Sequence, residues 1–314
     1  MTDRALLAQS LVSRLVPAEV APLTSREYWS LTRIAPVEEL EGLSAAEIGE
    51  RFGVEPDVAA RVPVLLGRGR ALALALEELE HKGFWVLTAD DARYPGRLQE
   101  RLGDAAPAML YGVGDAALLG VEGVGVVGSR DIGPDSADVA AEVARYAASK
   151  PVPIVSGAAR GVDRQAMGAA VEAGGTAVGV LADSLLRAAN DASTRRSIAA
   201  EQLCLVTPYS PAAGFSAGNA MGRNKIIYAL ARGTVVVRSD VDTGGTWAGA
   251  TEALTRGYST VVSWRGRGAG PGNERLVGLG AEPLDDVADL DGILRAAPAP
   301  GGRRSRDEVP VTLF

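Results

Sequence analysis

Six short apolar segments between residues 122 and 290 constrain the fold of this chain most strongly. They are rich in valine and apolar at nearly every position, and they cover residues 123–127, 152–156, 176–181, 203–207, 234–238 and 259–264. Strands that are apolar on both sides need cover on both faces, which parallel strands receive from the helices that connect them. The intervening segments have helical length and spacing, at residues 135–149, 162–173, 220–231 and 246–256. This alternation predicts a doubly wound α/β domain with a mainly parallel sheet.

The residues before this domain have a different sequence pattern. Residues 1–83 are helix-like, and Leu72, Leu76 and Leu79 predict a long amphipathic helix that ends at Gly83. A short strand is expected at residues 84–88, directly after that helix. The sequence therefore predicts a small helical domain in front of the α/β domain.

These differences in sequence pattern predict the domain boundaries. We expect the helical domain at residues 1–83, a lead-in segment at 84–121, the α/β domain at 122–295 and a tail at 296–314. The tail is rich in proline, glycine and charge, so we expect it to be disordered. Three arginines of the tail could help to hold an anionic partner, although a solvated tail is the favoured interpretation; they are Arg303, Arg304 and Arg306.

The sequence also indicates a compartment. No window of about 18 uncharged apolar residues occurs, which argues against a transmembrane helix. The amino terminus lacks the charged-then-apolar layout of a secretory signal. The single cysteine, Cys204, leaves no intramolecular disulfide and no multi-cysteine zinc site. We therefore expect a cytoplasmic protein without a membrane partner.

The charge balance limits how this chain can bind nucleic acid. Acidic residues number 39 against 32 basic residues, giving a net charge of −7. Global attraction to a phosphate backbone is absent, so nucleic acid could be held only by a local basic patch. A small phosphorylated ligand is compatible with this balance as well.

Residues for catalysis are mostly missing. The only histidine, His81, lies beside Lys82 in the helical region and is expected on the surface. Without another histidine, Ser-His-Asp or Cys-His catalysis in the α/β domain is disfavoured. The chain contains no HExxH, no GxxxxGK[ST] and no GxGxxG motif. We expect a binding protein rather than an enzyme, with no catalytic residue, cofactor or metal.

Two glycine-containing loops follow the first two predicted strands. The first holds Gly128, Ser129 and Arg130, and the second holds Ser156, Gly157, Arg160, Gly161 and Asp163. Glycines let backbone N–H groups approach a ligand closely, and helix starts favour anions. A plain loop is the favoured interpretation of the first tripeptide alone, and a helix cap is the favoured interpretation of Asp163 alone.

Two further loops flank the fifth strand. A cluster of Arg223, Asn224 and Lys225 lies on the predicted helix before it, and Gly244, Gly245 and Thr246 open the helix after it. Cationic side chains and free backbone N–H groups together suit a phosphate or another anion. A solvated basic helix face is the alternative for the first cluster. Ligands of such sheets bind beyond the carboxyl ends of the strands, where these loops would meet.

The ordered series of motifs resembles the DNA-processing protein A family (DprA, also called Smf). It runs from Tyr94-Pro95 through Val-Gly-Ser-Arg130, Ser-Gly-Ala-Ala-Arg-Gly-Val-Asp163, Arg223-Asn-Lys-Ile-Ile227 and Gly244-Gly-Thr246 to Gly272-Asn273. The resemblance covers roughly residues 90 to 285. It implies an extended Rossmann-like fold with a SAM-like helical domain in front. It also implies a homodimer that binds single-stranded DNA during transformation and helps a RecA-type recombinase to load.

The chain departs from the family pattern at several positions. Met167 stands where the family usually has a histidine, Ala220 where it has an aromatic residue and Arg238 where it has an acidic one. Phe215 is an offset aromatic residue nearby. We also expect the chain to lack the carboxyl-terminal winged-helix domain of many members.

The sequence supports two mechanisms. In the preferred one, Arg130, Arg223 and Lys225 bind the phosphates of single-stranded DNA, and Arg160 and Arg164 extend the basic surface. Steep salt dependence is then expected. In the alternative, the same loops hold one small nucleotide derivative, and the protein acts as a sensor, for example in phage defence. A scaffold with a vestigial site is a third interpretation.

Overall fold

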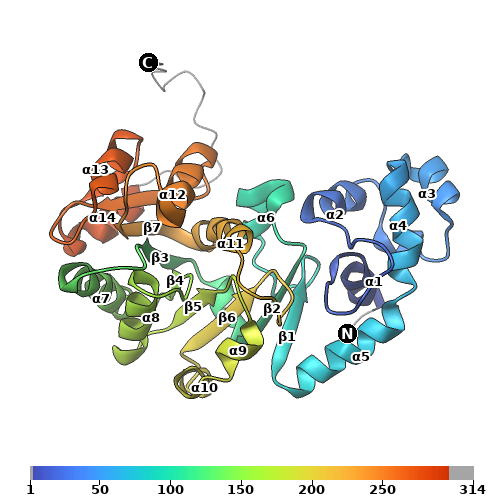
Figure 1. Cartoon of the computed structure of the whole chain (residues 1–314), viewed down its shortest axis with the longest axis horizontal. Coiled ribbons are helices and arrows are strands. Elements are labelled where there is room, and N and C mark those ends of the chain that lie inside the picture. Colours follow the sequence, from blue (N-terminus) through green and yellow to red (C-terminus); the bar gives the residue numbers. More distant parts are fainter. Residues whose placement is uncertain (1–2, 297–314) are drawn as a thin grey trace. The chain divides into compact units, whose positions relative to one another are not determined.

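The computed structural model describes residues 3–296 and forms two compact units (Figure 1). The first unit comprises Met1–Val121 and Ala177–Arg223, and the second comprises Glu122–Thr176 and Asn224–Phe314. The division does not follow chain order, because the chain leaves the second unit after Thr176 and returns to it after Arg223. The predicted tail begins at Ala296, which ends a described helix, and the rest of the tail with its arginines lies outside the described residues.

The first unit begins with a group of helices, drawn in blue to cyan in Figure 1. They are α1 (Asp3–Val12), α2 (Ser25–Thr32), η1 (Val37–Leu40), α3 (Ala45–Phe52), α4 (Pro56–Leu66) and α5 (Gly69–His81). Capping boxes start two of them, with Thr24 and Glu27 before α2 and Ser44 and Glu47 before α3. The predicted helical character of this region is confirmed, and Leu72, Leu76 and Leu79 are buried along α5 as expected.

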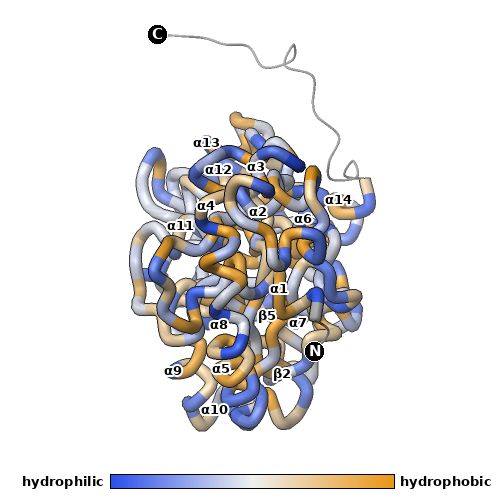
Figure 2. Tube along the Cα trace, turned by 90° about the vertical axis from the view of Figure 1, so that its right-hand side faces the viewer, coloured by the Kyte–Doolittle hydropathy of each residue, from blue (hydrophilic) through white to orange (hydrophobic). Residues whose placement is uncertain are grey.

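Apolar side chains from these helices form one core. Tyr28, Leu31, Ile48 and Leu65 are each 2 % exposed or less. Figure 2 shows the corresponding pattern, with hydrophobic residues interspersed among hydrophilic ones along the helices. Amphipathic helices of this kind are stabilised mainly by burying one face against their neighbours.

The first unit also holds four strands in the order β1-β2-β6-β5. They are β1 (Phe84–Thr88), β2 (Met109–Gly114), β6 (Leu203–Thr207) and β5 (Ala177–Val180). β2 is antiparallel to both β1 and β6, whereas β5 and β6 are parallel. Shorter helices complete the unit: α6 (Arg97–Leu102), η2 (Gly103–Ala105), η3 (Ala116–Gly120), α9 (Leu185–Ala189) and α10 (Ala192–Ala199). Helix α11 (Ala217–Leu230) crosses the division between the units after Arg223.

The second unit contains five strands in the order β4-β3-β7-β8-β9, all parallel. They are β3 (Gly123–Gly128), β4 (Ile154–Ser156), β7 (Ala231–Arg238), β8 (Thr260–Trp264) and β9 (Glu282–Leu284). The helices are α7 (Pro134–Ser149), α8 (Val162–Glu172), α12 (Gly244–Arg256), α13 (Pro271–Gly278), η4 (Val287–Asp289) and α14 (Leu290–Ala296). Every apolar segment predicted as a strand overlaps one, so the α/β fold with a mainly parallel sheet is confirmed.

The strand order fixes where a ligand can bind. The chain runs from β3 to β4 in one direction along the sheet and from β7 to β8 in the other. Right-handed crossovers then place α7 and α8 on one face and α12 and α13 on the other. The contacts agree, since α7 packs against α8 and α12 packs against α13. The topological switch point lies between β3 and β7, and ligands of such sheets bind beyond the strand ends there.

Candidate functional site

Three loops of the second unit meet at this switch point. They follow β3, β4 and β7, and we call residues 129–133, 157–161 and 239–243 the loop cluster. The Ser129 N–H donates to the Arg238 carbonyl at 3.0 Å, which joins the ends of β3 and β7. The Val162 N–H donates to the Ser129 carbonyl at 3.2 Å and draws in the loop after β4. The three strand ends predicted to meet are therefore brought together.

Glycine at position 161 makes this close approach possible. Gly161 has φ +89°, and a Cβ there would lie 2.3 Å from the Ser129 carbonyl oxygen. No side chain fits that space, and the backbone conformation itself favours glycine. Ala158 in the same loop has φ 52°, and Asp242 in the loop after β7 has φ 54°. Left-handed residues other than glycine cost free energy and cluster at functional sites.

The serines at the ends of β3 and β4 are engaged within the protein. The Ser156 hydroxyl is fully buried and donates to the Val126 carbonyl at 2.6 Å. The Ser129 hydroxyl accepts from the Asp131 N–H at 3.2 Å. Both hydroxyls therefore hold the conformation of the loops. Gly128 is half-buried and ends β3. Gly157 follows Ser156 and is buried.

Asp163 does not occupy the cap of α8, so that expectation was wrong. The helix begins after Gly161, which has no side chain to cap it, and Asp163 lies in its first turn. The carboxylate is only 6 % exposed. Burial, and secondarily the charge of Asp163, raises the pKa of the Tyr228 hydroxyl in α11. An acidic residue in the first turn is stabilised by the helix dipole.

The basic cluster on α11 splits into buried and accessible parts. Arg223 is 5 % exposed and belongs to the first unit by its contacts, whereas Asn224 and Lys225 are half-buried in the second. The Asn224 side-chain amide donates to the Gly245 carbonyl at 3.0 Å. This bond ties α11 to the first turn of α12.

Helix α12 starts with accessible backbone. Gly244 and Gly245 are exposed and Thr246 is half-buried. Thr243 precedes the helix and makes no side-chain cap hydrogen bond. The first N–H groups of a helix have no intrahelical acceptor, so this helix start offers donors to an anion.

Exposed cations surround the helix starts. Arg130, Arg160 and Arg164 are exposed, and Arg164 lies in the first turn of α8. Within residues 3–296, Arg160, Arg164 and Lys225 make no ion pair. A cation at a helix amino terminus is disfavoured by the dipole, so Arg160 and Arg164 suit a site that an anion fills.

Carboxylates are present in the loop cluster too. Asp131, Asp240 and Asp242 are all exposed there. The local balance of charge is therefore close to neutral. Anion binding at this place depends on where the cations and N–H groups point rather than on net charge.

One buried residue below the loop cluster escaped sequence reasoning. Asn273, in the first turn of α13, is 1 % exposed. Its Oδ1 accepts from the Ser239 N–H at 2.8 Å, and its Nδ2 donates to the Val236 and Trp264 carbonyls, each at 2.9 Å. The side chain therefore links the ends of β7 and β8. The Gly-Asn pair was visible in the sequence, but its partners are distant along the chain.

Other residues that the sequence analysis named are not part of the loop cluster. His81 is exposed at the end of α5, and Phe215 is 56 % exposed in the first unit. Met167 is buried in α8. Across the part of the chain that the structure describes, no helix is both long and apolar enough to cross a membrane. Among those same residues, no three metal-ligating side chains come together.

Comparison with known proteins identifies the family. The family model for DNA recombination-mediator protein A matches residues 85–293. A Mycobacterium tuberculosis protein, provisionally named DNA processing protein DprA, is 27 % identical over 93 % of this chain and 76 % of its own length. The residues matched by the family model include the loop cluster and all its neighbouring strands.

Solved structures show the same fold. The DNA processing protein A of Streptococcus pneumoniae superposes with a TM-score of 0.70 at 23 % identity, covering 93 % of this chain and 98 % of that chain. DNA processing protein A of Helicobacter pylori, described by its single-stranded DNA binding mode, gives 0.56 at 22 % identity over 68 % of this chain and 95 % of that chain. The match of the family model over most of the sequence is decisive, and the chain belongs to the DNA recombination-mediator protein A family.

Proposed function

We propose that this protein binds single-stranded DNA by its phosphates at the loop cluster. Membership of a family of recombination mediators supports a nucleic-acid ligand, and the Helicobacter pylori relative is described as binding single strands. The proposal extends to a homodimer in the cytoplasm that helps a RecA-type recombinase to load.

A single observation carries the proposal. Arg160, Arg164 and Lys225 make no ion pair within residues 3–296, and two of them flank the amino terminus of α8. These cations therefore stay available to an anion, which the helix dipole at the start of α8 also favours. A phosphate is an anion of the size and charge that guanidinium groups bind well.

Backbone donors would complete the contact. Gly244, Gly245 and Thr246 present the first N–H groups of α12, and Asn224 fixes that helix start. Gly128, Ser129, Arg130, Ser156, Gly157, Gly161 and Asp163 build the neighbouring loops. Phosphate contacts of this kind position a strand without reading its sequence, so we expect little base preference.

Arg223 is buried, unlike the exposed arginines that we assign to phosphate binding. Its side chain is 5 % exposed, so direct access of a phosphate to its guanidinium would require rearrangement. We therefore assign the electrostatic contacts first to Arg130, Arg160, Arg164 and Lys225.

The proposal is one of binding without a reaction. The only histidine, His81, is exposed on α5 of the first unit. The only cysteine, Cys204, is fully buried, and burial raises the pKa of its thiol, so a reactive thiolate is disfavoured.

The test is fluorescence-anisotropy titration of labelled oligo-dT of about 35 nucleotides, a length several times that covered by one single-strand site. We compare the wild type with Arg160→Ala/Lys225→Ala and with the control Arg145→Ala/Arg256→Ala. The control removes two exposed arginines at other parts of α7 and α12. Two lost charge-assisted contacts should weaken binding by roughly tenfold or more in the first variant.

Two outcomes would contradict the proposal. Equal affinities for the two double variants would move the site away from the loop cluster. Failure to bind oligo-dT at low salt, together with saturable binding of a nucleoside triphosphate, would favour the small-nucleotide alternative.

A further inference from the structure

Strand β1 leaves one edge without a partner strand. It stands at the end of the strand order and pairs only with β2. Within residues 3–296, no other strand pairs with β1. An open strand edge presents a row of backbone donors and acceptors, which is a template for another strand.

The register shows which residues face this open edge. The Ala89 N–H donates to the Ala108 carbonyl at 3.0 Å, and these two residues continue the β1–β2 register. Hydrogen-bonded pairs alternate along an antiparallel ladder, so Trp85 and Leu87 bond across to β2. The main-chain groups of Phe84, Val86 and Thr88 therefore point outward.

One outward group is already engaged. The Thr88 carbonyl accepts from the Asp91 N–H at 2.9 Å. The N–H of Thr88 and both main-chain groups of Val86 remain directed to the open edge. Thr88 is 2 % exposed whereas Val86 is only half-buried, so the two main-chain groups of Val86 are the ones that an added strand can reach.

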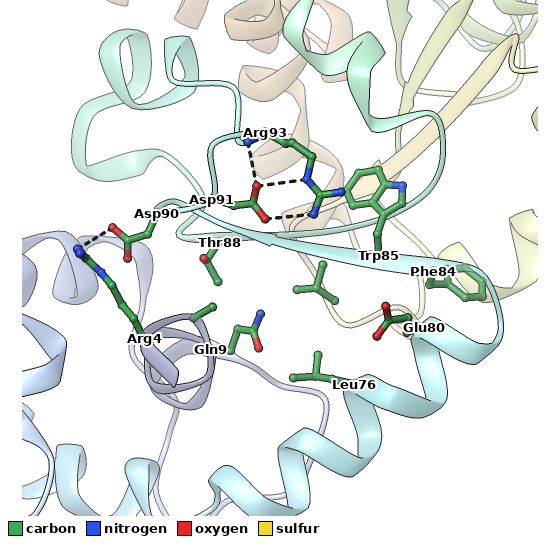
Figure 3. A pocket seen from close by; sticks show the side chains of 12 residues that line it. Arg4, Gln9, Leu76, Glu80, Phe84, Trp85, Thr88, Asp90, Asp91 and Arg93 are labelled. Atoms are coloured by element: carbon green, nitrogen blue, oxygen red, sulfur yellow. Dashed lines mark hydrogen bonds and ion pairs between the residues drawn. The ribbon is translucent and has the colours of Figure 1, made fainter. Parts of the chain in front are cut away.

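A cavity of about 580 Å³ lies along this edge (Figure 3). Helices α1 and α5, strand β1 and the loop after β1 enclose it, all within the first unit. Leu76 from α5 and Phe84 from β1 provide apolar wall, and Trp85 stands on the other side of the strand. The site is thus a groove with a strand edge on one side and helices on the other.

Trp85 is held firmly on the opposite side of β1 from Leu76. Its Nε1 donates to the Gly114 carbonyl at 2.8 Å. A Cβ on Gly112 would lie 2.1 Å from the indole, so the ring lies directly over this glycine of β2. The indole is therefore fixed against β2 and is not free to fill the groove.

Gln9 supplies an unsatisfied group inside the groove. Its side chain is 4 % exposed, and its Oε1 accepts no hydrogen bond from any described residue. Figure 3 shows the carboxamide between Thr88 and Leu76, facing β1. A carboxamide offers an acceptor and donors side by side, as a peptide main chain does. Buried acceptors are nearly always paired, so Gln9 points to a missing donor.

The charges around the groove are paired with one exception. Arg4 pairs with Glu38 and with Asp90, each at 3.1 Å, and Arg93 pairs with Asp91 at 3.2 Å. Glu80, which lines the groove near Phe84, makes no ion pair with any described residue. The groove therefore leaves one carboxylate available to a basic side chain.

We propose that this groove binds an extended segment of a partner protein as an added strand beside β1. The segment would pair one edge of its main chain with Val86 and the other edge with the Gln9 carboxamide. Apolar residues at alternate positions would pack on Leu76 and Phe84, and a lysine or arginine would face Glu80. Strand addition combines main-chain affinity with side-chain pockets in this way.

The test uses the full chain and the blocked hexapeptide acetyl-Thr-Val-Thr-Val-Thr-Lys-amide. Residue-resolved amide hydrogen exchange is measured by NMR during the titration. Exchange at Val86 should slow by roughly tenfold or more at saturation, while Trp85 and Leu87 stay unchanged because they already bond to β2. This difference between alternate residues is specific to an added strand.

Three comparisons sharpen the result. A peptide with proline at the fourth position lacks one N–H and should not protect Val86. Gln9→Leu should lose the protection, and its own Trp85 and Leu87 amides report whether it folds. Glu80→Gln should remove the preference for the lysine peptide over its norleucine counterpart, whereas Glu77→Gln, exposed on the same helix, should keep it.

Three outcomes would overturn the proposal. Exchange at Val86 could stay unchanged at millimolar peptide. Protection could rise equally at Val86, Trp85 and Leu87, which would report global stabilisation. Protection at Val86 could also depend on protein concentration without peptide, which would assign the edge to a second copy of this chain.

Discussion

The side-chain amide of Asn224 donates a hydrogen bond of 3.0 Å to the carbonyl oxygen of Gly245. The bond joins the middle of α11 to the first turn of α12, where backbone N–H groups are open to an anion. It places a side chain of the predicted basic cluster in a positioning role. Lys225, the next residue, stays half-buried and free of ion pairs among the described residues.

Replacing Asn224 tests this positioning role. Asn224→Ala should lower the affinity for oligo-dT by roughly fivefold to tenfold, the cost of about one lost hydrogen bond. Circular dichroism should show an unchanged fold. Asn190→Ala, exposed in the first unit, is the control and should bind like the wild type. Equal affinity of Asn224→Ala and wild type would remove Asn224 from the site.

Two glycines of one segment should respond oppositely to alanine. Gly161→Ala forces a Cβ to within 2.3 Å of the Ser129 carbonyl oxygen at a positive φ. The free energy of unfolding should therefore fall by at least about 2 kcal/mol. The Cβ added by Gly168→Ala in α8 meets nothing within 4 Å. This variant should raise the free energy of unfolding by about 0.5–1 kcal/mol. Urea denaturation of both variants measures the difference. A neutral Gly161→Ala would contradict the proposed close contact of the loops.

Asn273 should matter for stability before it matters for binding. Asn273→Ala leaves the Ser239 N–H and the carbonyls of Val236 and Trp264 without their partner. Each buried unsatisfied group costs about 1–3 kcal/mol, so a loss of about 3 kcal/mol or more is expected. Thermal unfolding provides the measurement. A loss below about 1 kcal/mol would show that water replaces the side chain.

Acid should weaken the helical part of the first unit through Glu27. Burial alone raises the pKa of Glu27, but hydrogen bonds from Arg61 and Thr24 outweigh it, and the net pKa is lowered. A lowered folded-state pKa gives stability that is present above the unfolded value and lost as the pH falls through the folded value.

The matched variant is Glu27→Gln. It should be less stable than the wild type at pH 7 by about 1 kcal/mol, the value of a partly exposed charged hydrogen bond. The difference should shrink as the pH falls toward 3, because wild-type Glu27 is then becoming protonated. Urea unfolding at several pH values measures it. A difference that stays constant with pH would assign the effect to packing.

The parallel strands could be predicted because their signal is local. Each apolar run, such as the valine-rich residues 234–238, is short and lies between two helices along the chain. Strand β2 gives no such signal, since Tyr111 and Gly112 interrupt its apolar pattern and its pairing with β1 and β6 is antiparallel. Strand β9 contains Pro283, which disfavours a strand in sequence reasoning.

The loop cluster was predictable in place but not in detail. Strand ends fix where Ser129 and Gly161 lie, so their meeting follows from topology. The rotation of α11 does not follow from sequence, because the packing of Ile226 and Ile227 decides which cations are buried. Arg223 is consequently hidden while Lys225 is accessible. The Gln9 groove depends on residues from separate helices and a strand, and no spacing along the chain indicates it.

The salt dependence of oligo-dT binding tests the central claim most directly. Single strands release about 0.7 counterion per phosphate contact, so removing two contacts should change the log–log slope by about 1.4. We predict this shallower slope for Arg160→Ala/Lys225→Ala and the wild-type slope for Arg145→Ala/Arg256→Ala. Parallel lines for all three proteins would contradict phosphate capture at the loop cluster.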